Sequence, residues 1–147
     1  MATITARLTL TGTGTTSDVL NIDKSKALSV TNPTVQVGTT KLTTAFATTI
    51  TDLDGTNNTI DTYLYIMNTS SGSETVHVQV VASSTAATQS GTCDSCTLTQ
   101  GTVTQSPLVK LAKGEFAIVP LEAAAHVQFK GSATTAIMEY GFWTKGS

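Results

Sequence analysis

The chain has 147 residues, with eight basic and ten acidic side chains and a formal net charge of −2. This length is typical of one domain, and we expect residues 1–147 to form a single one. The lysines are scattered singly, so the sequence has no basic patch for nucleic acid. No apolar run approaches the roughly 18 residues of a membrane-spanning helix, and the N-terminal region lacks the apolar block of a signal peptide. We therefore expect a soluble protein made in the cytosol, with no membrane partner.

The composition favours strands over helices. Thr accounts for 31 residues and Ser for 13, whereas only 12% of the residues are charged. A β-branched hydroxyl side chain suits the solvated face of a sheet better than the surface of a helix. With 39% hydrophobic residues, the chain also has enough apolar material for a core. We expect an all-β domain whose surface is polar but carries few charges.

The N-terminal third predicts three short strands. Apolar and polar residues alternate over residues 4–10, which is the period of a half-buried strand. Residues 27–31 predict a second strand that an Asn-Pro pair ends, and residues 34–37 return to β structure. Residues 40–51 carry apolar side chains at a spacing of four, which would also fit a helix. The density of Thr and the absence of a capping signal argue against that interpretation.

The middle of the chain predicts a hairpin and a long connection. Residues 51–61 form a loop by their Asp, Gly and Asn content, and they lead into an apolar strand over residues 61–68. A Ser/Gly turn then leads into residues 75–81, where Val alternates with polar residues, so these two strands predict an antiparallel hairpin. Residues 83–101 are rich in Ser, Thr, Gly and Ala, and they predict a long surface loop or an irregular hairpin.

The last third predicts four more short strands, separated by turn segments. They cover residues 108–111, 116–121, 126–130 and 134–144. The whole chain then has about eight or nine strands at close spacing and no convincing helix. This pattern predicts an antiparallel β-sandwich of jelly-roll type.

Two of the late strands are apolar on both faces. In the last strand, Met138 and Phe142 share one face while Trp143 lies on the opposite one. Residues 116–119 alternate in the same way, with Phe116 and Ile118 opposite smaller apolar residues. A second sheet or a packed loop would cover the additional apolar face, and so would a neighbouring subunit. The scarcity of charged residues favours the subunit interface, because interface cores exclude Lys, Glu and Asp.

Cys93 and Cys96 form the only motif that suggests a chemical activity. A Cys-x-x-Cys pair binds zinc, exchanges disulfides or closes a small loop. Zinc needs about four ligands, and the sequence has no second pair. The flanking residues favour a loop over the helix that a thioredoxin-like site requires. We expect either a local disulfide, formed after release from the cell, or two idle thiols, and no metal or other cofactor.

The other candidate sites have simpler explanations. One loop carries enough oxygen ligands to suggest calcium, namely Asp52, Asp54, Asn57, Asn58 and Asp61. The spacing differs from that of an EF-hand and favours a solvated loop. His77 and His126 are expected to be surface or rim residues and not general bases. No catalytic motif is present, so we expect a protein that is not an enzyme.

The C-terminal third resembles the closing hairpins of small virion structural proteins of tailed bacteriophages. In such proteins a strand that begins Gly-Glu-Phe and ends in Pro precedes a strand of the pattern Ala-x-x-Glu-Tyr-x-x-aromatic. The matching residues here are Gly114, Glu115, Phe116, Pro120, Ala136, Glu139, Tyr140 and Trp143. Residues 61–80 similarly resemble the central hairpin of these proteins, where a strand ending in Asn passes through a Ser/Gly turn into a Val-rich strand.

The resemblance implies a non-enzymatic component of a phage particle, most of all a capsid decoration or cement protein. Such a protein is made in the host cytoplasm, is released by lysis and acts by contact with copies of itself and with the major capsid protein or another virion protein. Because aromatic side chains dominate interface energetics, we expect the interface to include Tyr63, Tyr65, Phe142 and Trp143. Strand-edge pairing or an N-terminal arm over residues 1–10 would serve equally well.

Three other functions compete with this one. A tail or neck component would have the same construction and the same kind of contacts. A carbohydrate-binding or adhesive β-sandwich would need exposed aromatic platforms, and the chain has only one Trp, three Tyr and four Phe. A redox or zinc enzyme would depend entirely on Cys93 and Cys96.

Overall fold

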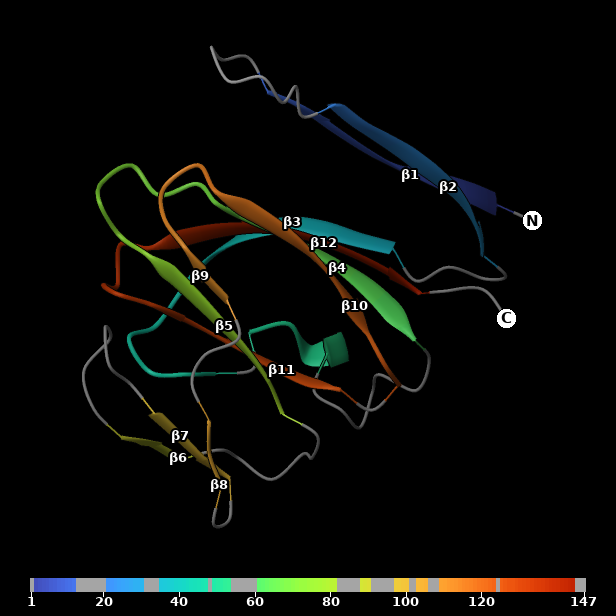
Figure 1. Ribbon diagram of the computed structural model, residues 1–147. Helices are drawn as coiled ribbons and strands as arrows, with labels where there is room; N and C mark the ends of the chain where they lie inside the picture. Colours follow the sequence, from blue (N-terminus) through green and yellow to red (C-terminus); the bar gives the residue numbers. More distant parts are fainter. Residues whose placement is uncertain are drawn as a thin grey trace. The chain divides into compact units, whose positions relative to one another are not determined.

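The structure is a computed structural model of the chain. It describes residues 2–12, 21–30, 35–47, 49–53, 61–81, 88–90, 97–100, 103–105, 109–123 and 125–144. These residues form twelve strands and one short 3₁₀ turn, η1 (Thr51–Leu53) (Figure 1). The strands are β1 (Ala2–Thr11), β2 (Asn21–Val30), β3 (Val35–Lys41), β4 (Thr62–Asn68), β5 (Val76–Val81), β6 (Thr88–Ser90), β7 (Thr97–Gln100), β8 (Val103–Gln105), β9 (Val109–Leu111), β10 (Phe116–Leu121), β11 (His126–Gly131) and β12 (Ile137–Thr144).

The chain divides into two compact units. The smaller unit contains the β1–β2 hairpin, and the larger unit covers Thr34–Thr144. The sequence indicated one domain over the whole chain. The division follows from the packing of the strands, because every residue of the buried hydrophobic core identified in the structure lies in the larger unit.

The hairpin is a long two-stranded ribbon. β1 and β2 pair antiparallel over ten residues each, from Ala2 opposite Val30 to Thr11 opposite Asn21. The alternation at residues 4–10 therefore does correspond to a strand, as predicted. The second strand is longer than the predicted residues 27–31, because the polar residues before Ala27 continue the pairing with β1.

The larger unit is built on two antiparallel sheets. One has four strands in the order β10-β4-β12-β3, and the other has three in the order β11-β5-β9. Beyond β11, Ala47 forms an isolated antiparallel bridge with Phe129 through backbone hydrogen bonds of 3.0 and 3.1 Å. The Ala47 segment thus occupies the place of a fourth strand in the second sheet.

This strand order is that of a jelly roll. If the Ala47 segment is counted as the second strand position after β3, one sheet has the positions 1-8-3-6 and the other 2-7-4-5. Chain neighbours β4 and β5 then lie in different sheets, and so do β11 and β12, as a sandwich of two Greek keys requires. The predicted fold class, an antiparallel all-β sandwich of jelly-roll type, is confirmed.

The predicted hairpin between residues 61–68 and 75–81 is wrong. β4 pairs with β10 and β12, whereas β5 pairs with β11 and β9. The Ser/Gly segment between β4 and β5 carries the chain from one sheet to the other. A turn-rich sequence between two alternating strands predicts a change of direction, but it does not determine whether the second strand pairs with the first.

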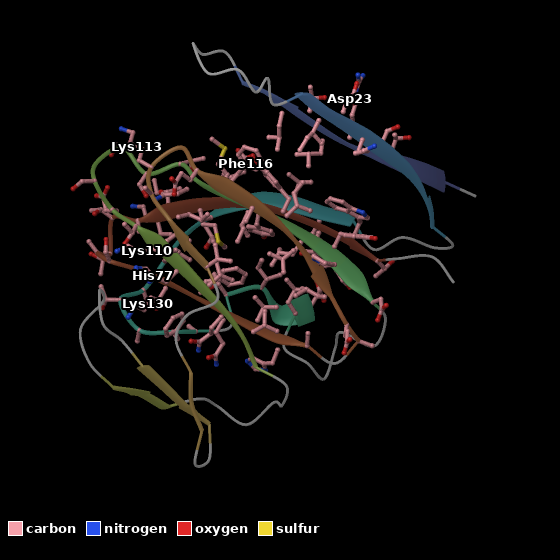
Figure 2. All side chains as sticks on the ribbon, in the orientation of Figure 1. Asp23, His77, Lys110, Lys113, Phe116 and Lys130 are labelled. Carbon is pink, nitrogen blue, oxygen red and sulfur yellow. The ribbon has the colours of Figure 1, made fainter. Side chains whose placement is uncertain are left out.

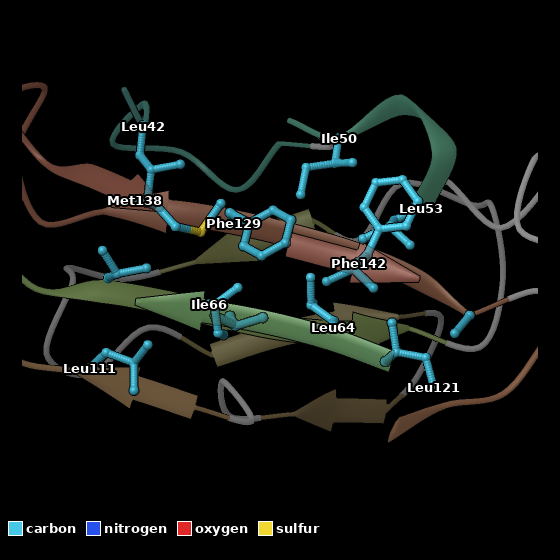
Figure 3. Packing of buried hydrophobic residues seen from close by; sticks show 14 of the residues in the cluster. Leu42, Ile50, Leu53, Leu64, Ile66, Leu111, Leu121, Phe129, Met138 and Phe142 are labelled. Carbon is cyan, nitrogen blue, oxygen red and sulfur yellow. The ribbon is translucent and has the colours of Figure 1, made fainter. Parts of the chain in front are cut away.

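The core lies between the two sheets. β4 and β12 contribute alternate buried residues from one side, among them Leu64, Ile66 and Met138, and β11 contributes Phe129 from the other (Figure 3). Leu53, at the end of η1, is also fully buried. The core cluster consists of Leu42, Ile50, Leu53, Leu64, Ile66, Val76, Val78, Leu111, Leu121, Ala125, Val127, Phe129, Ala136, Met138 and Phe142. Residues 40–51 supply loop side chains to this core rather than a helix, as the Thr-rich sequence predicted.

Within residues 83–101, expected to form a loop or an irregular hairpin, the structure has two short strands. β6 pairs antiparallel with β7, and β7 pairs in turn with β8, so the hairpin alternative is the one observed. The connection between β6 and β7 contains Cys93 and Cys96, which lie outside the described residues.

Candidate functional site

The outer side of the four-stranded sheet is mostly apolar and aromatic. Alternate residues of β4 and β12 point into the core, so the residues between them point away from it. The register then aligns these outward residues with those of β3 and β10 on either side. We refer to them together as the outer face. It consists of Val37, Thr39, Lys41, Tyr63, Tyr65, Met67, Phe116, Ile118, Pro120, Ile137, Glu139, Gly141 and Trp143.

Two aromatic contacts cross the strands of this face. Tyr63 and Trp143 are paired between β4 and β12, and their rings stack with centroids 5.9 Å apart and planes 25° apart. Tyr65 and Phe116 lie on β4 and β10 with centroids 6.4 Å apart in a tilted arrangement. Cross-strand aromatic pairs stabilise a sheet and fix the orientation of the rings. The two contacts therefore hold the aromatic rings of the outer face in defined orientations.

The face is most exposed along its two edge strands. Val37 on β3 is 75% exposed, and Phe116 and Ile118 on β10 are 57% and 49% exposed. Between these edges the surface is low, because Gly141 has no side chain: a Cβ there would lie 3.7 Å from Val37 Cγ2 and 3.8 Å from Tyr65 Cδ1. Large exposed apolar side chains grouped on one face indicate a contact surface.

Glu139 and Lys41 are the two charged residues that the register places on the outer face. The Tyr65 hydroxyl donates to Glu139 Oε1 over 3.3 Å, and Met67 Sδ lies at the same distance from that hydroxyl. Burial raises the pKa of the Tyr65 hydroxyl above its ordinary value of 10.0, and the Glu139 carboxylate raises it further. At neutral pH the hydroxyl therefore stays protonated and remains a donor to the carboxylate.

The Trp143 indole is incompletely satisfied. Its Nε1 atom is buried and has no hydrogen-bond acceptor among the described residues. Buried polar groups in folded proteins almost always have a partner. The indole N–H is thus an exception to this rule among the described residues.

Three of the four predicted interface residues lie together on the outer face. These are Tyr63, Tyr65 and Trp143. The inclusion of Phe142 was wrong, because its side chain points into the core and is only 2% exposed. The strand alternation that places Trp143 outside necessarily places Phe142 inside.

Sequence reasoning missed the two most exposed large residues of β10. Phe116 and Ile118 are absent from the predicted interface, although they alternate with the inward-facing Ala117 and Val119. The alternation itself was visible in the sequence. What was missing was the sheet order, which places β10 at an edge next to the aromatic residues of β4.

The loop that was considered as a calcium site is hydrogen-bonded to other parts of the chain at both of its described ends. Asp52 accepts a hydrogen bond from Gln36 Nε2, and Asp61 Oδ1 accepts one from the Ala123 backbone N–H over 3.0 Å. Asp54 lies outside the described residues, as do Cys93 and Cys96. In the described part of the chain, no group of three or more His, Cys, Asp or Glu side chains is placed to hold a metal ion.

Both histidines are buried, which corrects the prediction that they lie on the surface or rim. His77 is 2% exposed and His126 is 7% exposed. They share the side of the three-stranded sheet that faces away from the core. Between them, Gln79 Nε2 donates to Gln128 Oε1 over 2.5 Å, while Gln128 Nε2 lies 3.4 Å from His126 Nε2.

A cross-strand row of basic residues lies on this same side of the sheet. Lys130 on β11 pairs with His77 on β5, and His77 pairs with Lys110 on β9 (Figure 2). Lys130 is fully buried, and its Nζ lies 5.0 Å from the centroid of the Phe46 ring. Thr75 Oγ1 lies 2.9 Å from His77 Nε2. This burial could not be predicted from the sequence, because alternation identifies a polar face without indicating what covers it.

No helix in the described ranges is long and apolar enough to cross a membrane. Comparisons with protein-family models, with curated proteins and with solved structures find no match to this chain.

Proposed function

We propose that this protein is a structural component of a bacteriophage particle, most of all a capsid decoration or cement protein that assembles with copies of itself. The single observation that carries the proposal is the outer face. It exposes Val37, Phe116 and Ile118 at its edges, and cross-strand ring contacts order its aromatic side chains. The free energy falls when another protein covers a surface of this composition, because apolar area is removed from water. The protein then acts by burying surface and not by chemistry.

The fold is compatible with this role. Jelly rolls occur in viral capsid and lectin domains, among others. The strand order is therefore compatible with a capsid role and also with other functions. Two observations favour a location on the phage particle. These are the low charge content and the resemblance of the late strands to those of virion proteins. Release by lysis would account for a Thr- and Ser-rich surface on a protein made in the cytosol.

The energetics favour a repeated contact. A specific interface buries about 1,000 Å² or more, and a capsid presents the same contact many times by symmetry. Because the contacts of a bound oligomer act together, each one can be modest while the assembly is stable. The aromatic residues at the centre of the outer face are the side chains that most often dominate such contacts.

A carbohydrate-binding role is the alternative from another class. The Tyr63–Trp143 stack is a ring platform of the kind that sugars contact. The surrounding side chains favour a protein partner instead, because Val37, Phe116 and Ile118 offer no hydrogen bonds to hydroxyl groups. A tail or neck component would use the same face in the same way, and it differs only in its position on the particle.

The test is the mass of the purified full-length protein over a range of concentrations, together with its co-sedimentation with capsids and, separately, tails of the phage that encodes it. We expect an oligomer that binds capsids, and we expect Ile118→Glu to weaken that binding at least tenfold. Thr134→Glu is the matched control, because Thr134 is exposed in the turn before β12 and is not one of the outer-face residues. Binding to tails alone would instead support the alternative that the protein is a tail component. A monomer that binds neither particle nor itself would overturn the proposal.

A further inference from the structure

The β1–β2 hairpin has two chemically different sides. The register places Leu8 opposite Lys24 and Leu10 opposite Ile22, so these four residues share one side of the ribbon. Leu8 is 45% exposed and Leu10 is 40% exposed. We refer to Leu8, Leu10, Ile22 and Lys24 as the apolar side of the hairpin.

The opposite side of the hairpin is polar and carries an ion pair. Arg7 Nε donates to Asp23 Oδ1 over 3.0 Å, and Arg7 Nη2 donates to Asp23 Oδ2 over 2.6 Å. Thr5 and Thr9 lie on this side as well and are exposed. One side of the ribbon is therefore suited to water and the other is not.

A ribbon of this kind needs a partner. Two-stranded hairpins are at best marginally stable in water, and stability requires a third strand or packing of the apolar side. Among the described residues, no third strand pairs with either β1 or β2. Packing of the apolar side against another surface is the remaining source of stability.

We propose that the hairpin of one copy packs with its apolar side on the outer face of a second copy, which returns its own hairpin in the same way. This inference rests on the proposed function, since it specifies how the copies assemble. The two surfaces match in chemistry. Each is mostly apolar, and Lys24 on the hairpin is opposite in charge to Glu139 on the outer face. An approaching Lys24 would pair with that carboxylate.

The dimensions indicate a reciprocal exchange. A two-stranded ribbon is about 10 Å wide, and a seven-residue strand is about 23 Å long, so one docked hairpin covers roughly 230 Å² on each partner. One hairpin thus falls far short of a specific interface. Two hairpins exchanged by a twofold axis bury about 900 Å² in total, which is close to the roughly 1,000 Å² of the smallest specific interfaces. We therefore infer a symmetric pair of copies and not a one-way contact.

Isotope-mixed crosslinking tests the contact in the full-length protein. Equal amounts of ¹⁴N- and ¹⁵N-labelled protein are combined as dilute monomers and concentrated together, so that mixed pairs can form, and they are then treated with an amine-reactive crosslinker and analysed by mass spectrometry. We expect mixed-isotope links between Lys24 on the hairpin and Lys41, which is exposed on β3 beside Ile137 of the outer face. Lys110, on the three-stranded sheet, is the control and should form no link to Lys24. Links from Lys24 to Lys41 that occur only within one isotope label would overturn the exchange.

Point variants separate this inference from the proposed function. Leu8→Asp combined with Leu10→Asp should lower the association constant at least tenfold, whereas Thr5→Asp, on the polar side, should leave it within twofold. Lys24→Glu keeps the apolar residues and should weaken association about fivefold, with recovery when it is combined with Glu139→Lys. An oligomer that persists unchanged in all these variants overturns the hairpin exchange but leaves the proposed function standing. A wild-type protein that is monomeric and ignores capsids and tails overturns both.

Discussion

The Asn68 side chain, at the end of β4, donates a hydrogen bond of 3.0 Å from Nδ2 to the backbone carbonyl of Leu111, at the end of β9. The two residues belong to different sheets of the sandwich. Nδ2 also donates to the Glu74 carbonyl over 2.8 Å, and Oδ1 accepts from the Ser70 N–H over 3.0 Å. A single buried amide thus joins the two sheets where the chain crosses from β4 to β5.

Asn68→Ala should lower the free energy of unfolding by about 3 kcal/mol, because it removes three hydrogen bonds worth about 1 kcal/mol each and leaves buried groups without partners. Urea denaturation measures the loss. Thr69→Ala is the control: Thr69 is exposed and its Oγ1 makes only a 3.5 Å hydrogen bond. We expect it to cost less than about 0.5 kcal/mol. Equal losses in the two variants would contradict the role of Asn68.

Two glycines should respond differently to substitution by Ala. At Gly131 a Cβ would overlap the Ala136 Cβ and lie 2.8 Å from the Ala133 carbonyl oxygen, so Gly131→Ala should cost about 3 kcal/mol through overpacking. Gly114 has a φ of 79° and open space around the Cβ position. Gly114→Ala should therefore cost only about 1 kcal/mol of backbone strain, and Gly114→Asn less. Thermal unfolding of the three variants tests this order, and a costlier change at Gly114 would refute it.

Adjacent aromatic residues on β12 should separate stability from assembly. Phe142→Ala opens a cavity in the core and should cost about 3 to 5 kcal/mol of folding free energy. Trp143→Ala removes one ring of the stacked pair with Tyr63 and should cost no more than about 1.5 kcal/mol beyond the lost apolar area. Its main effect should be weaker oligomerisation, measured by light scattering. Unchanged oligomerisation in Trp143→Ala would argue against the outer face as the interface.

The contact between Lys130 and Phe46 should be measurable as a coupling energy. Lys130 Nζ lies 5.0 Å from the ring centroid and the lysine is fully buried, so water screens the interaction little. A double-mutant cycle with Lys130→Met and Phe46→Leu keeps both sites filled with apolar atoms. We expect a coupling of about 1 kcal/mol from urea denaturation. Strict additivity of the two changes would show that the ring does not hold the ammonium group.

The ion pair of the hairpin predicts a local pH dependence. The hydrogen bonds from Arg7 hold the pKa of the Asp23 carboxyl below its ordinary value of 3.8. The pair therefore supports the hairpin above that pH, and the support is lost as the pH falls through the lowered pKa of the folded state. Arg7→Gln should raise the pKa of Asp23 towards 3.8 in an NMR titration of the carboxyl carbon. Because both groups are exposed, the effect on global stability should be small.

The alternation of residues revealed much of the outer face, but only within single strands. It placed Trp143 opposite Phe142 and Phe116 opposite Ala117, and the structure has both arrangements. Alternation identifies which side chains share a side of one strand. It does not specify the neighbouring strand, so the pairing of Tyr63 with Trp143 came only from the fold.

The same limit explains the two main errors. β4 and β5 were predicted to pair because a turn-rich segment separates them, yet each finds its partners far along the chain. His77 was predicted at the surface because it alternates with core valines. Its burial depends on what covers the outer side of the three-stranded sheet, and local sequence contains no information on that.

The position of β12 between β3 and β4 has a consequence for the timing of assembly. β3 is synthesised early, but its only strand partner among the described residues is β12, about a hundred residues later. Pairing across such a distance is slow, and it must wait for the later segment to be made. The outer face is therefore complete only after β12 has been synthesised, so the order of translation delays the formation of this surface until nearly the whole chain has been made.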